Sequence, residues 1–169
     1  MAHKGQKYLI DAMPLVLREV PEAHLVIFGE GELRAPLERQ VKHLGLEKHV
    51  LLPGFREDVL SLVKSADLFV MSSVTEGLGS AVLDAMAMAL AVVGTRAGGI
   101  PEAVVPGRTG ELVEPGEPKP LGAAIVKLLK DRELRRAYGE SGRTRVRDLF
   151  GVDRLVEGTL AAYRRFTEG

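Results

Sequence analysis

The chain has 169 residues, and its 23 lysines and arginines are balanced by 23 aspartates and glutamates. This zero net charge gives no global indication of a nucleic-acid partner. The absence of cysteine excludes structural disulfides and thiolate metal sites, and it fits a cytoplasmic protein. The length and an apolar fraction of 46% predict one globular domain with a full core. The longest mostly apolar run, residues 80–93, is too short to span a bilayer.

The first part of the chain alternates between helical and strand patterns. Residues 6–20 repeat apolar side chains at helical spacing, so they predict a helix that Pro14 kinks and Pro21 ends. The apolar run 24–28 predicts a buried strand, and a second helix is expected over residues 32–44.

The middle of the chain repeats this alternation with shorter elements. Residues 50–52 predict a strand that ends in the turn 53–55. Asp58 is expected to cap a small helix. The apolar run 68–71 then predicts another buried strand, followed by a turn and a helix of strong helix formers.

The last part begins with a predicted strand over residues 91–94. Residues 98–102 are expected to open a helical turn, with Pro101 at its first position. The last strand, 110–113, is expected at the edge of the sheet. Three helices are predicted to close the chain: 120–130, 131–150 with a break near Gly139 or Gly142, and 152–166.

Strands that alternate with helices at this spacing predict an α/β fold with a doubly wound parallel sheet, Rossmann-like, in one domain covering residues 1–169. Ligands bind such sheets at the carboxyl ends of the strands. Four glycine-bearing turns are expected there: residues 29–31, 53–55, 72–79 and 95–99. This agreement predicts a ligand pocket lined by backbone.

The turn between residues 72 and 84 is the strongest candidate site. Gly77 and Gly79 allow close approach of a ligand, and the following helix offers unpaired N–H groups to an anion. Glu76 and Asp84 add two carboxylates. Tight-turn geometry explains the glycines as well, and a solvated helix face explains Asp84; an exposed terminal lysine is likewise the simpler interpretation of Lys4.

Other chemistries find little support in the residues. The four histidines have no partner at metal-ligand spacing, so we expect no metal site. The arginines of residues 132–147 alternate with acids, which favours a solvated helix face over a nucleic-acid surface. The sequence contains no Ser-His-Asp set and no Walker-type lysine turn.

These turns together resemble the C-terminal, donor-binding domain of retaining GT-B glycosyltransferases of the family-4 or group 1 type. The most specific part is an acid, seven residues and a second acid, from Glu76 to Asp84. The resemblance covers nearly the whole chain. Its other matching segments are 26–31, 54–55, 66–70, 98–102 and 107–113.

The resemblance implies a nucleoside-diphosphate-sugar donor whose sugar passes to an acceptor with retention at the anomeric carbon. Glu76 would bind sugar hydroxyls and Lys4 the pyrophosphate, and these two are the expected catalytic residues. The other implied donor contacts are the ribose at Asp84, the sugar and phosphates at Gly77, Leu78, Gly79 and Ser80, and the base at Gly54 and Phe55. No cofactor is implied, because the donor is a substrate.

Three departures from the family pattern stand out. The second acid is usually glutamate, whereas here it is Asp84. Residues 89–91 replace the usual glycine and proline between helix and strand. The strand expected ahead of Lys4, with its arginine, is absent, as is the N-terminal domain that would bind a carbohydrate, lipid or small-molecule acceptor.

The sequence therefore predicts the donor-binding half of a hexosyl-type glycosyltransferase. Alone, it is expected to bind nucleoside diphosphates weakly and to transfer little or no sugar. The full-length enzyme is expected in the cytoplasm or at the inner membrane face. One alternative is a non-catalytic nucleotide-sugar-binding module that works with a partner, or as a homodimer through the open sheet edge. A nucleotide-sugar epimerase is a weaker alternative.

Overall fold

A computed structural model describes residues 2–167 of the chain. Met1, Glu168 and Gly169, which belong to the predicted domain, lie outside the described residues. The described strands are β1 (Leu25–Phe28), β2 (Val50–Gly54), β3 (Phe69–Met71), β4 (Val92–Thr95) and β5 (Gly110–Val113). The described helices are η1 (Ala2–Lys4), α1 (Gln6–Glu19), α2 (Arg34–His43), α3 (Val59–Lys64), α4 (Ser80–Ala87), α5 (Ile100–Ala103), α6 (Pro118–Lys130), α7 (Arg132–Leu149) and α8 (Val152–Thr167).

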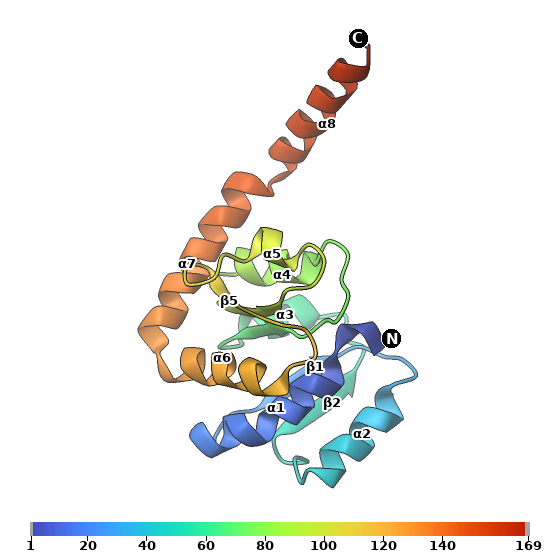
Figure 1. Cartoon of the computed structure of the whole chain (residues 1–169), viewed down its shortest axis with the longest axis vertical. Helices are drawn as coiled ribbons and strands as arrows, with labels where there is room; N and C mark the ends of the chain where they lie inside the picture. The colour runs from blue at the N-terminus through green and yellow to red at the C-terminus, as the bar shows by residue number, and fades with distance from the viewer. Residues whose placement is uncertain (1, 168–169) are drawn as a thin grey trace.

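The strands form two parallel sheets rather than one. β1 pairs with β2, and β3, β4 and β5 pair in that order. β5 is an edge strand, as the sequence predicted. In Figure 1 the pair β1–β2 lies below the sheet that ends in β5. All pairs are parallel because each strand returns to its neighbour through a helix or a long loop.

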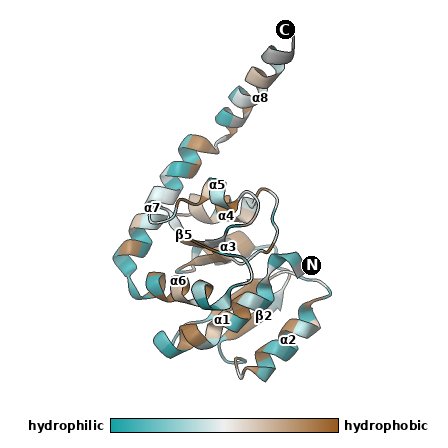
Figure 2. Ribbon diagram, in the orientation of Figure 1, coloured by the Kyte–Doolittle hydropathy of each residue, from teal (hydrophilic) through white to brown (hydrophobic). Residues whose placement is uncertain are grey.

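Two apolar cores lie on opposite faces of the strands. α1, α2 and α6 cover the first core, which includes Ile10, Val16 and Leu128. α4 and α5 cover the second, which includes Met86 and Ile100, and α7 packs at its margin. Figure 2 shows the apolar residues of these elements in brown. The doubly wound α/β prediction is therefore confirmed, with helices on both faces.

Most predicted boundaries fall within two residues of the observed ones. α1 continues through Pro14 and ends before Pro21. Asp58 does stand at the N-cap of α3, but its carboxylate makes no bond to the helix backbone. It accepts hydrogen bonds from Arg56 instead, at 2.8 Å each.

The predicted break in α7 was wrong. α7 runs without interruption from Arg132 to Leu149, and both of its inner glycines lie on the face that meets α4. A side chain on Gly139 would overlap the carbonyl of Ala89, and one on Gly142 would contact Met86. These glycines therefore serve close helix packing, which outweighs their weak helix propensity.

The turn after α4 carries unusual backbone strain. Among the described residues Ala89 is the single non-glycine residue with positive φ, at 60°. This is the position where glycine would relieve the steric conflict between Cβ and the backbone.

The C-terminal part of the chain projects from the body. α8 extends away from both sheets in Figure 1, beyond the end of α7, which itself packs against α4. Val152, Val156 and Leu160 of α8 are exposed. None of the helices in the described part of the chain combines the length and the apolar composition that a membrane span requires.

Candidate functional site

The candidate site lies at the carboxyl ends of the strands, around the loop from Ser72 to Gly79. This loop joins β3 to α4. Ser72 and Ser73 are buried, whereas Gly77 and Leu78 are exposed. The loop thus begins inside the molecule and reaches the surface at its glycine turn.

Lys4 and Glu76 are in direct contact at this loop. The Lys4 Nζ donates to Glu76 Oε1 at 3.0 Å and to Oε2 at 2.8 Å. The Glu76 side chain is 10% exposed and that of Lys4 is 37% exposed. Two of the predicted site residues, 72 positions apart, are therefore joined in one ion pair.

Two further donors hold the Glu76 carboxylate. Ser73 Oγ donates to Oε2 at 2.8 Å, and the Gly77 N–H donates to Oε1 at 3.2 Å. Burial raises the pKa of Glu76, but the hydrogen bonds from Lys4 and Ser73 and the charge of Lys4 outweigh it. The pKa of Glu76 therefore lies below its ordinary value of 4.5. Glu76 is ionised and fixed in place.

β4 and the loop that follows it hold the loop from Ser72 to Gly79 in place. Thr95, at the end of β4, donates its hydroxyl to the Ser73 carbonyl at 2.6 Å. Gly99 N–H donates to the Gly77 carbonyl at 2.8 Å. A side chain on Gly98 would overlap the Glu76 carbonyl. Gly98 and Gly99, in one of the four turns predicted to line a ligand pocket, therefore pack against the Glu76 turn.

Gly5 brings Lys4 to the loop. It adopts a left-handed conformation with φ 66°, and a side chain there would overlap the Ser72 carbonyl. Ser72 Oγ donates to the Lys4 carbonyl at 3.2 Å. The Val74 N–H donates to the His3 carbonyl at 2.7 Å. The start of α1 is thus attached to the end of β3 by backbone contacts.

The first turn of α4 faces solvent beside this cluster. No side chain caps its N-terminus, which starts at Ser80 after Gly79 in a left-handed conformation. Asp84 lies on the same helix with its side chain exposed, and its carboxylate has no hydrogen-bond or ion-pair partner among the described residues. The structure therefore brings Lys4 and Glu76 together but leaves Asp84 separate.

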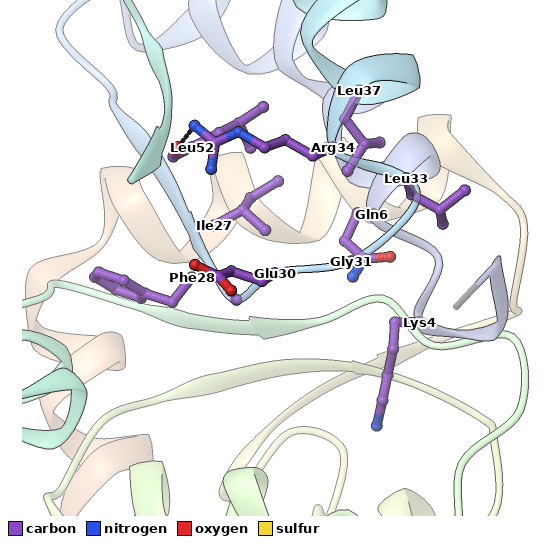
Figure 3. Close-up of a pocket in the computed structure, with 11 residues that line it drawn as sticks. Lys4, Gln6, Ile27, Phe28, Glu30, Gly31, Leu33, Arg34, Leu37 and Leu52 are labelled. Atoms are coloured by element: carbon purple, nitrogen blue, oxygen red, sulfur yellow. Dashed lines mark hydrogen bonds between the residues drawn. The ribbon is translucent and has the colours of Figure 1, made fainter. Parts of the chain in front are cut away.

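Two hollows meet at the Lys4–Glu76 pair. One, of about 240 Å³, is lined by Lys4, by residues 27–31 at the end of β1 and by Arg34 of α2. Figure 3 shows the Lys4 side chain pointing away from Gln6 and Gly31. The other, of about 260 Å³, lies over His3, Thr75, Glu76 and Gly77.

The first hollow contains polar groups that no sequence pattern indicated. Arg34 donates to the Leu52 carbonyl at 3.0 Å, drawn as a dashed line in Figure 3. The Oε1 atom of Gln6 is buried and has no hydrogen-bond partner among the described residues. Gly54 lies next to Arg34 at the end of β2, and Phe55 is 66% exposed. Of the two predicted base contacts, Gly54 therefore lies next to residues that line this hollow, and neither Gly54 nor Phe55 lines it.

Sequence analysis missed the residues that hold the site together. Ser73, Thr95 and Gly5 were not singled out, because serine, threonine and glycine are common in turns. The described residues contain no group of three or more histidine, cysteine, aspartate or glutamate side chains that could hold a metal ion.

Comparison with known proteins places the chain in a family. The family described as glycosyl transferases group 1 matches residues 1–145. The chain is 35% identical over 148 residues to N-acetyl-alpha-D-glucosaminyl L-malate synthase of Bacillus anthracis, a match covering 88% of this chain and 39% of that protein. It spans about two fifths of the length of the curated relatives it matches.

Solved structures show the same fold. The C-terminal domain of a group 1 glycosyl transferase from Francisella tularensis superposes with a TM-score of 0.83 at 31% identity, covering 90% of this chain and 82% of that domain. The Anabaena protein HepE, crystallised in complex with UDP, superposes with a TM-score of 0.84 at 27% identity. That match covers 96% of this chain and 46% of HepE.

Proposed function

Because the chain belongs to the group 1 glycosyltransferase family, we propose that it is the donor-binding half of a retaining enzyme that transfers a hexosyl group from a nucleoside-diphosphate sugar. Residues 1–169 form this half, and the acceptor is bound by a separate N-terminal domain. The HepE complex, which contains UDP in a protein of the same fold, supports a nucleotide ligand.

The observation that carries this proposal is the cluster of Lys4, Glu76 and Ser73 at the carboxyl ends of the strands. A cation suits phosphate oxygens, and an ionised carboxylate accepts strong hydrogen bonds from sugar hydroxyls. A nucleoside-diphosphate sugar presents both groups side by side. The pair is also fixed by buried neighbours, as a binding site requires.

The two hollows fit the two ends of such a donor. We assign the nucleoside to the hollow that Lys4, residues 27–31 and Arg34 line, next to Gly54, and the sugar to the hollow over Glu76 and Gly77. The diphosphate then lies between them, over Lys4 and the first turn of α4. We further assign the ribose to Asp84, which lies on α4 outside the linings of both hollows.

The reaction breaks the bond between the anomeric carbon and the phosphate oxygen. The same carbon bonds to a hydroxyl oxygen of the acceptor, whose proton passes to the departing nucleoside diphosphate. Positive charge develops on the sugar and negative charge on the departing nucleoside diphosphate. Lys4 and the N–H groups of Leu78 to Ser80 stabilise that leaving group. One helix end contributes only about 1 kcal/mol, so stabilisation of the leaving group also needs the cation of Lys4. Glu76 positions the sugar and needs no proton transfer.

Calorimetric titration of the 169-residue chain with UDP, GDP and ADP tests the proposal. We expect weak binding of at least one diphosphate, and a loss of about tenfold in affinity in Lys4→Ala. The matched control is Lys42→Ala, which removes an exposed lysine from the C-terminal turn of α2 and leaves affinity unchanged. A folded chain that binds none of the three diphosphates contradicts the proposed site.

A further inference from the structure

Two histidines that are distant in the sequence lie side by side at the amino ends of β1 and β2. The ladder of these two parallel strands begins with Leu25 opposite Val50. His24 and His49 each stand one residue ahead of this pair, so they are neighbours across the ladder. Their ring centres are 5.3 Å apart, and their ring planes are inclined by 34°. No metal-ligand spacing links the two residues in the sequence, so only the fold reveals the pair.

Backbone carbonyls orient both rings. His24 Nδ1 lies 2.9 Å from the Glu22 carbonyl oxygen, and His49 Nδ1 lies 3.1 Å from that of Ala23. A carbonyl oxygen can only accept a hydrogen bond, so in each neutral ring Nδ1 carries the proton and donates it. Each Nε2 therefore keeps its lone pair and faces away from these carbonyls. A carbonyl bonded to the second ring nitrogen is also what orients histidines that bind metal ions.

The separation of the two rings suits a shared metal ion. A zinc–nitrogen bond is about 2.0 Å long, and the centre of an imidazole lies about 1.2 Å behind the bound nitrogen. Two rings on one tetrahedral ion therefore have centres about 5.2 Å apart, close to the 5.3 Å between His24 and His49. A plain contact between two rings has its centres about 4.5–7 Å apart as well. The distance thus points to an ion only in combination with the two outward lone pairs.

An ion can reach the pair directly from solvent. Side chains alternate along a strand, so His24 shares a face of the sheet with Val26, and His49 shares it with Leu51. Val26 is 41% exposed and Leu51 is 51% exposed, and His24 itself is exposed. Within the described part of the chain no third histidine, cysteine, aspartate or glutamate joins the pair in a metal-binding group. Water therefore takes the other two positions of a tetrahedral ion.

The chemistry of the two ligands selects the class of metal. Imidazole nitrogens suit zinc, nickel and copper, whereas magnesium and calcium prefer oxygen ligands. We propose that His24 and His49 form a two-histidine site for a divalent cation of the first group, such as Zn²⁺. The bound ion joins the amino ends of β1 and β2 and stabilises the folded chain. The proposal does not depend on the donor site, which lies at the opposite, carboxyl ends of the strands.

Calorimetric titration of the 169-residue chain with zinc chloride tests the site. We expect one saturable equivalent of zinc, and an affinity about tenfold or more lower in His24→Gln, because the amide replaces one of the two ligands. The matched control is His43→Gln, which removes an exposed histidine at the end of α2 and should leave the affinity unchanged. Magnesium chloride should give no binding. No saturable zinc binding, or equal affinities in the wild type and His24→Gln, overturns the proposal.

Nitrogen-15 NMR of the histidine rings gives a readout that does not depend on affinity. In the metal-free chain we expect the proton on Nδ1 in both His24 and His49. Zinc should then shift the Nε2 signals of these two rings together and leave the signals of His43 unchanged. A proton on Nε2 in either ring of the pair, or a zinc-dependent shift in only one of them, overturns the proposal.

Thermal unfolding tests the effect of the ion on the fold. Saturating zinc should raise the midpoint of unfolding by a few degrees in the wild type, because the ion binds the folded chain in preference to the unfolded one. His24→Gln should show little or no such increase, whereas His43→Gln should respond as the wild type does. Equal increases in all three chains overturn the proposal.

Discussion

Lys4 cannot bind Glu76 and a diphosphate equally well at the same time. Its Nζ has three N–H donors, and both short bonds recorded for it go to the Glu76 carboxylate. A diphosphate must therefore compete with Glu76 or share the lysine with it. The sugar of an intact donor offers Glu76 new partners, whereas a bare diphosphate does not.

Glu76→Gln should consequently change the affinities for the nucleoside diphosphate and for the nucleotide sugar in opposite directions. We expect the affinity for the bare nucleoside diphosphate to rise a few-fold, because an exchange of about 1 kcal/mol changes a binding constant by about fivefold. The affinity for the nucleotide sugar should fall, because the amide accepts weaker hydrogen bonds than the carboxylate. Calorimetric titration of both ligands measures the two effects.

The matched control is Glu133→Gln on α7, which removes an equal charge far from the site. It should leave both affinities unchanged. Equal losses for both ligands in Glu76→Gln refute the competition and the sugar contact together.

The lowered pKa of Glu76 predicts an acid-dependent loss of stability. A carboxylate whose folded pKa is depressed stabilises the protein above its unfolded pKa, here near 4.5, and loses that contribution as the pH falls through the folded value. The effect should be about 1 kcal/mol or less, because Lys4 is partly exposed. Urea unfolding of the wild type and Glu76→Gln should give free energies that converge below pH 4.5. A difference between the two free energies of unfolding that stays constant across this pH range contradicts the prediction.

At the scale of elements, the turn between α4 and β4 contains a strained residue whose replacement should stabilise the protein. Ala89 adopts φ 60°, which costs a residue with a Cβ atom roughly 1–2 kcal/mol. Ala89→Gly should therefore raise the free energy of unfolding by about 1 kcal/mol in urea denaturation. Ala137→Gly, at an exposed position inside α7, should lower it by a similar amount. A loss of stability in both variants contradicts the assigned strain.

The loop after β4 should hold the loop after β3, which carries Glu76, in its position. Gly98→Ala places a side chain on the Glu76 carbonyl, so it should displace the Glu76 turn and weaken nucleotide binding about tenfold or more. Gly45→Ala is the matched control, since Gly45 also has positive φ, at 66°, but open space around it. Both variants should lose stability, and only Gly98→Ala should lose ligand affinity by calorimetry. Unchanged affinity in a folded Gly98→Ala chain rules out this coupling.

Local pattern explains why the elements were predictable and the site only partly so. Apolar runs located β1 and β3, because a buried strand needs apolar side chains at consecutive positions. The ion pair between Lys4 and Glu76 joins residues 72 positions apart, so only the fold reveals it. The continuity of α7 through Gly139 could not be predicted from sequence either, because it also depends on contacts between distant residues. Tertiary packing there outweighs the local propensity from which the break was inferred.

At the scale of the molecule, the chain should bind a donor without turning it over. The proposed acceptor-binding domain lies outside these residues, and orientation of both substrates provides a large share of rate enhancement in group transfer. We expect no sugar transfer above background from the 169-residue chain, and transfer once an acceptor-binding domain is joined to it. A coupled assay of nucleoside-diphosphate release measures this, with Lys4→Ala in the joined protein as the inactive control. Sugar transfer by the 169-residue chain alone contradicts this prediction, because one domain is then sufficient for catalysis.

The ion pair of Lys4 and Glu76 also bears on how quickly a donor arrives. An approaching diphosphate meets a lysine whose charge is already balanced, in a chain whose formal charge is zero. Long-range attraction between the empty site and its ligand is therefore weak, and the encounter rate depends little on ionic strength. The attraction becomes strong only after the phosphates have come within contact distance and displaced the carboxylate. The affinities of different ligands should then differ mainly through their dissociation rates rather than their association rates.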